Sequence, residues 1–126
     1  MIRYAYNQQV EPPAPFVLVT LRNPVTGMER DKVPAQLDYA ADRTLLPSDV
    51  VQALVLPAIG SLLIGGVGGT VAEMTVYAVS IGVHQLPPRP VEVVSHPNEP
   101  WILLGRDVLN SHRIVLDGPQ LALEIA

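Results

Sequence analysis

Asp38 is the residue whose surroundings most need a chemical explanation. It lies between an alternating run, residues 33–37, and an apolar run, residues 44–46. A carboxylate placed between two apolar segments is costly to bury unless it is paired or hydrogen-bonded. One explanation is catalytic, because two carboxylates held close together share a proton, so that one can activate water while the other protonates a leaving group. The other explanation is a turn aspartate that accepts bonds from nearby backbone amides.

Three segments of the chain resemble, in the same order, the signature segments of the retropepsin-like (retroviral-type) aspartic proteases. Residues 37–47 read Leu-Asp-Tyr-Ala-Ala-Asp-Arg-Thr-Leu-Leu-Pro and are similar to the active-site pattern Leu-Asp-Thr-Gly-Ala-Asp with its following apolar strand. Residues 64–70, Ile-Gly-Gly-Val-Gly-Gly-Thr, resemble the flap of that family. Residues 102–110, Ile-Leu-Leu-Gly-Arg-Asp-Val-Leu-Asn, resemble its second signature. The resemblance covers roughly residues 15–125.

The resemblance implies an all-β fold, a closed barrel with a flap hairpin and one or two short helices, over residues 16–126. It implies an aspartic endopeptidase without a cofactor, in which Asp38 is the catalytic residue. Because the chain has one such segment, the second carboxylate must come from a second copy, so a twofold homodimer is expected. The residues implied in substrate binding are Ala40, Ala41, Asp42, Gly65, Gly66, Val67, Gly68 and Gly69.

Asp42 and Arg106 are expected to form a structural pair, because in the family the acid four residues after the catalytic aspartate meets the arginine of the second signature. A bidentate pair of arginine and carboxylate suits a partly buried site. The flap segment has an alternative interpretation as an ordinary hairpin turn.

The triplet Asp38-Tyr39-Ala40 departs from the family pattern Asp-Thr/Ser-Gly. Tyr39 is far bulkier than Thr, and Ala40 keeps the backbone amide of the usual glycine but adds a methyl group. Three hypotheses follow: an endopeptidase with activity that the triplet weakens, an inactive retropepsin-like domain that binds peptides or proteins, and a β-barrel interaction domain in a larger assembly.

Composition limits the other functional classes. The chain has 126 residues, enough for one domain, and its net charge of −4 with no basic block argues against nucleic acid as a partner. Charged residues are only 16% of the chain, which suggests that some apolar surface is buried against another chain. There is no cysteine, and the three histidines have no metal-binding spacing, so no metal site is expected.

No signal peptide or membrane span is expected. The N-terminal segment lacks the apolar core of a signal peptide. Residues 53–72 are uncharged, but they contain five glycines and Pro57, which disfavour a single spanning helix. We therefore expect no membrane partner and, without a feature that fixes the compartment, a cytoplasmic protein.

The pattern of short apolar runs between Gly and Pro turns predicts the secondary structure. Residues 1–15 are expected to be an extended arm, either disordered or crossing to a partner subunit. Short helices are expected at 48–54 and 106–111. The last strand, 121–125, would be an apolar edge if left alone, so we expect it in the dimer interface. The predicted strands are 16–21, 33–37, 44–46, 55–64, 70–83, 91–94, 101–104, 113–116 and 121–125.

Overall fold

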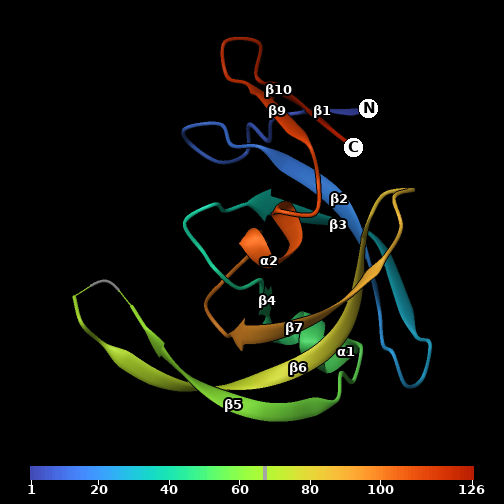
Figure 1. Cartoon of the computed structure of the whole chain (residues 1–126). Coiled ribbons are helices and arrows are strands. Elements are labelled where there is room, and N and C mark those ends of the chain that lie inside the picture. The colour runs from blue at the N-terminus through green and yellow to red at the C-terminus, as the bar shows by residue number, and fades with distance from the viewer. Residues whose placement is uncertain (67) are drawn as a thin grey trace.

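The computed structural model describes residues 1–66 and 68–126 and consists mainly of strands (Figure 1). In chain order the elements are β1 (Ile2–Ala5), β2 (Phe16–Arg22), β3 (Glu29–Leu37), β4 (Leu45–Pro47), α1 (Ser48–Ala53), β5 (Ala58–Gly65), β6 (Val71–Val83), β7 (Arg89–His96), β8 (Ile102–Leu104), α2 (Arg106–Leu109), β9 (Ile114–Asp117) and β10 (Ala122–Ile125). Within the described ranges, no helix is long and apolar enough to cross a membrane.

Six strands close into a barrel. Their order is β2-β3-β8-β4-β7-β6, and β6 pairs back onto β2. Strand β5 is not one of these six. It pairs with β6, and the two strands form a long hairpin that extends away from the barrel (Figure 1). The predicted all-β fold, with a closed barrel and two short helices, is confirmed.

The core lies inside the barrel and follows the period of two expected of strands. In β2, Val17, Val19 and Leu21 are fully buried, while Leu18 and Arg22 are exposed. Burying a side chain of this size contributes about 1.5–3 kcal/mol. The core therefore fixes which face of each strand points inward.

The buried side chains of the long strand β6 do not all lie on one face. Val76 is buried on one face, whereas Val79, Ile81 and Val83 are buried on the other. The first half of β6 belongs to the projecting hairpin and the second half to the barrel, so the two halves face different surroundings. The register of β5 on β6 also shifts between Ala58 and Gly60.

The chain termini form a separate three-stranded sheet in the order β1-β10-β9. The expectation of a free or partner-crossing arm is wrong for residues 2–5, because β1 pairs antiparallel with β10 of its own chain. The side chains of Ile2, Tyr4 and Tyr6 alternate in sequence and pack against the core. The last strand is not an edge of the single chain, since β10 lies between β1 and β9; its expected place in a dimer interface stays a prediction.

Candidate active site

Asp38 stands in the first position after β3, in a loop that is tied to the neighbouring strand. Its backbone N–H donates to the carbonyl of Leu104, with N and O 2.9 Å apart. Its side-chain Oδ1 accepts from the N–H of Ala40 at 3.1 Å. The second carboxylate oxygen has no protein donor among the described residues. The side chain is half-buried, so one oxygen is held in place while the other is free to contact water or a ligand.

Thr44 fastens the loop to the segment that precedes α2. It is fully buried, and its Oγ1 donates to Asp107 Oδ1 at 2.7 Å while accepting from the N–H of Gly105 at 3.1 Å. The N–H of Thr44 donates to Asp107 Oδ2 at 3.0 Å. Asp107 thus accepts from both the backbone and the side chain of Thr44. Sequence reasoning missed Thr44, although a hydroxyl at the start of the apolar run 44–46 was an available signal.

The predicted ion pair between Asp42 and Arg106 is wrong. Arg106 Nη1 instead donates to the backbone carbonyl of Tyr39 at 2.6 Å. The backbone N–H of Arg106 donates to the carbonyl of Ala41 at 2.9 Å. Asp42 is exposed, and no ion pair joins it to an arginine in residues 1–66 and 68–126. Arg106 therefore stabilises the turn after Asp38 by donating to two backbone carbonyl groups of that turn. Asp107, through its bonds to Thr44, is the acid that joins this loop to α2.

The two residues that depart from the usual triplet lie at the surface of the single chain. Tyr39 is 44% exposed, and Ala40 is exposed as well. Partial burial raises the pKa of the Tyr39 phenol above its ordinary value, so the ring stays neutral at acidic and neutral pH. In one chain the bulky ring is accommodated without displacing the bond from the Ala40 amide to Asp38.

The glycine cluster lies at the end of the β5–β6 hairpin. Gly65 ends β5, and Gly66 donates its N–H to the carbonyl of Thr70 at 2.7 Å. Gly68 and Gly69 have φ angles of 85° and 78°, a region that favours glycine. Val67, which was also predicted to bind substrate, lies outside the described residues.

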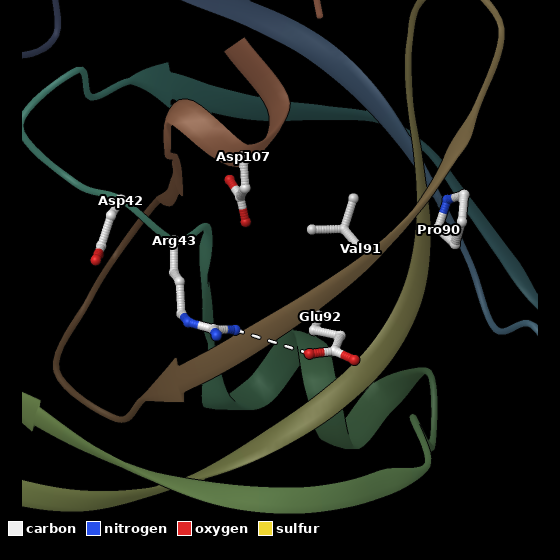
Figure 2. A pocket seen from close by; sticks show the side chains of 6 residues that line it. All are labelled: Asp42, Arg43, Pro90, Val91, Glu92 and Asp107. Carbon is white, nitrogen blue, oxygen red and sulfur yellow. Dashed lines mark ion pairs between the residues drawn. The ribbon is translucent and has the colours of Figure 1, made fainter. Parts of the chain in front are cut away.

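A pocket of about 420 Å³ lies beside the Asp38 loop (Figure 2). Arg43 Nη1 and Glu92 Oε2 face each other across it, 3.9 Å apart. Of the predicted substrate-binding residues, only Asp42 lines this pocket; Asp38 does not. The described residues hold no group of three or more side chains placed to bind a metal ion. The lining residues are Asp42, Arg43, Pro90, Val91, Glu92 and Asp107.

Replacing Thr44 by Val should destabilise the protein, because the nearly isosteric change removes the hydroxyl that bonds both Asp107 and Gly105. A buried amide left without its acceptor lowers the free energy of unfolding by about 1–3 kcal/mol. Urea denaturation of Thr44→Val and of Thr75→Val, an exposed threonine of β6, measures the difference. Equal stability of the two variants would mean that the Thr44 bonds contribute nothing.

The fold of this chain is shared with solved protein structures, although its sequence matches no known family. No family model and no curated protein matches the sequence. A solved EIAV protease, complexed with the inhibitor HBY-793, is similar in structure with a TM-score of 0.62 and 23% sequence identity, over 86% of this chain and 93% of that chain. A retropepsin-like aspartic protease from Rickettsia conorii is similar with a TM-score of 0.64 and 12% identity, over 99% of this chain and 91% of that chain. The chain therefore has the fold of the retropepsin-like aspartic proteases.

Proposed function

We propose that this chain is an aspartic endopeptidase whose catalytic dyad consists of Asp38 from each of two copies. The observation that carries the proposal is the position of the Asp38 carboxylate: it directly follows barrel strand β3, and one of its oxygens accepts from the Ala40 amide while the other accepts no bond from any described residue. One carboxylate cannot act as acid and base at once, so a single chain holds half of the machinery.

In the proposed reaction, the ionised Asp38 carboxylate removes a proton from a water molecule, which attacks the carbonyl carbon of the peptide bond. The protonated Asp38 of the other copy hydrogen-bonds the carbonyl oxygen and stabilises the negative charge that develops there. The carbon–nitrogen bond then breaks, and the proton taken from water leaves with the amine. Two carboxylates at close range share one proton, so activity should have a bell-shaped dependence on pH.

The substrate is a peptide in extended form that lies between the Asp38 loop and the β5–β6 hairpin. The glycines of the hairpin let a second backbone approach closely, since they carry no side chain. We assign substrate contacts to Ala40, Ala41 and Asp42 on one side, and to the hairpin glycines on the other. Closure of the hairpin over the peptide would exclude water from the reaction.

The second candidate function is an inactive domain that binds peptides through the same cleft. The residues Tyr39 and Ala40 favour it, because two tyrosine rings and two extra methyl groups would crowd the dyad. A displacement of about an ångström at reacting groups can lower a rate roughly a hundredfold. Peptide binding without turnover would select this candidate.

Hydrolysis of a peptide library at pH 4–6 tests the first function, with a pepstatin-type inhibitor as the chemical control. Asp38→Asn should abolish cleavage, because an amide cannot share the proton, whereas Asp49→Asn changes an exposed acid of α1 and should cleave like the parent. Cleavage that survives in Asp38→Asn would remove Asp38 from the mechanism. If the parent binds peptides and never cleaves them, the binding function remains.

A further inference from the structure

A second pocket, of about 430 Å³, adjoins the pocket of Figure 2, and we call it the β6–β7 pocket. Pro90, Val91 and Glu92 of β7 line both pockets. The rest of its lining comes from β5, β6 and the turn after β2, and it is mostly apolar. A volume of this size with apolar walls and few polar groups is typical of a site for a small molecule. The remaining lining residues are Pro24, Ile59, Ala78, Val79 and Ser80.

Neighbouring residues of β6 and β7 form the floor of the β6–β7 pocket. Ala78 lies opposite Glu92 in the antiparallel ladder, and Ser80 lies opposite Pro90. Residues directly opposite each other point to the same face of a sheet, as do residues two apart on one strand. The small side chains of Ala78 and Ser80 therefore leave a depression on this face, beside the Glu92 carboxylate.

One wall of the pocket is Ile59, and an irregularity in β5 explains its position. The register of β5 on β6 shifts between Ala58 and Gly60, so Ile59 has no partner on the described part of β6. An extra residue of this kind points its side chain away from the regular pattern of its strand. Ile59 is 50% exposed although it is large and apolar. A ligand in the pocket would remove part of this apolar surface from water.

A second wall, Pro24, is held in place by a buried asparagine. Asn23 is 1% exposed, and its Nδ2 donates to the carbonyls of Leu54 and Val55 at 2.9 and 3.0 Å. Its Oδ1 accepts from two backbone N–H groups of its own turn, at 2.9 and 3.2 Å. The turn after β2 is thereby fastened to the segment before β5. The walls are thus formed before a ligand arrives, which lowers the cost of binding.

Glu92 is the one charged side chain among the described residues that line the β6–β7 pocket. Its side chain is 65% exposed, and its ion-pair partner Arg43 is 3.9 Å away and lines the other pocket. No hydrogen bond from a described residue reaches the carboxylate at that distance. A carboxylate beside an apolar depression complements a ligand that has a cationic head and an apolar body.

We propose that the β6–β7 pocket binds a small organic amine, with its ammonium group on Glu92 and its apolar body against Ile59 and Pro24. The Ser80 hydroxyl offers a second polar contact. The four-carbon stem of a lysine side chain would leave much of this volume empty, so a free amine with an aromatic or branched body fits better. The site needs neither Asp38 nor a second copy, so it goes beyond the proposed function.

Titration calorimetry at pH 7 with phenylbutylamine and with the neutral phenylbutanol tests the recognition of charge. The parent should bind the amine roughly tenfold more tightly, because bonds to charged groups are the stronger ones. Glu92→Gln should abolish this difference and leave the affinity for the alcohol unchanged. Glu73→Gln, at an exposed acid of β6 outside the pocket, is the matched control and should bind like the parent. Equal affinity of the parent for the two probes would overturn the proposal, as would an amine affinity that Glu92→Gln leaves unchanged.

Substitutions in the apolar part of the pocket test where the ligand lies. Ile59→Ala should weaken both probes by the same factor, roughly tenfold, because it removes apolar contact and no charge. Ala78→Leu fills the floor and should abolish binding, whereas Ala72→Leu, at an exposed alanine of the same strand, should not. Circular dichroism checks that Ala78→Leu is folded, and Ile59→Ala carries the test if it is not. Probes that bind both Ala78→Leu and Ile59→Ala like the parent would refute the site.

The outcomes for this pocket and for catalysis can be separated. Asp38→Asn should bind phenylbutylamine like the parent, because Asp38 does not line the pocket. A parent that binds the amine and never cleaves peptides would refute the protease function and leave the site standing. A parent that cleaves peptides but binds neither probe at millimolar concentration would refute the site and leave the protease function standing. A lysine-containing peptide that binds here where the free amine does not would also refute the proposal.

Discussion

Changing Tyr39 to Thr together with Ala40 to Gly is expected to accelerate peptide cleavage, by up to roughly a hundredfold. The reason is steric. The double change removes a bulky ring next to each Asp38 and a methyl group beside each carboxylate, while the backbone amide at position 40 still donates to Asp38 Oδ1. Relief of crowding lets the two carboxylates approach the distance at which they share a proton. Initial rates on one peptide from pH 3 to 7 measure the effect.

The same double change also predicts a tighter dimer, because overpacking at a close contact costs about 1–3 kcal/mol. Sedimentation of the parent and the variant checks this independently of catalysis. Adding Asp38→Asn to the variant is the control and should remove all of the gained activity. If the variant cleaves no faster than the parent, the triplet does not limit the rate.

Gly105→Ala is expected to give the largest loss of stability, about 3 kcal/mol. A Cβ atom at this position would lie 2.5 Å from the carbonyl carbon of Arg43 and 2.9 Å from the backbone nitrogen of Thr44. Both neighbours are backbone atoms, so relief requires the loop after Asp38 to move. That movement would also disturb the bond from the Gly105 N–H to Thr44 Oγ1.

Urea denaturation compares Gly105→Ala with Gly60→Ala, whose added Cβ would meet no atom within 4 Å. Gly60→Ala should unfold close to the parent. Because the Asp38 loop is built on this contact, Gly105→Ala should also lose cleavage activity in the fraction that remains folded. Equal stability of the two variants would show that the close approach at Gly105 is readily relieved.

The sequence predicted much of the barrel because its signals are local. Alternation marked β2 and the end of β3, and Gly and Pro clusters marked the turns between most strands. The short helices α1 and α2 were predicted close to their observed positions. Resemblance to a known family then supplied the closed barrel, which single-strand patterns do not contain, since closure depends on pairing between distant strands.

The errors concern contacts between distant segments. The partner of Arg106 could not be read from spacing, because the turn places the Tyr39 carbonyl within its reach and leaves Asp42 in solvent. The docking of β1 on β10 joins the two ends of the chain. Its one local signal, the alternation of Ile2, Tyr4 and Tyr6, was hidden in a polar segment. The partners of Thr44 lie more than sixty residues away in sequence.

The most direct test of the central claim mixes the parent chain with Asp38→Asn at a fixed total concentration and measures peptide cleavage after the subunits have exchanged. If each active site needs Asp38 from both copies, activity follows the square of the parent fraction, so an equal mixture retains about a quarter of the parent activity. An equal mixture that retains about half would mean that each chain works alone, and would contradict the dyad.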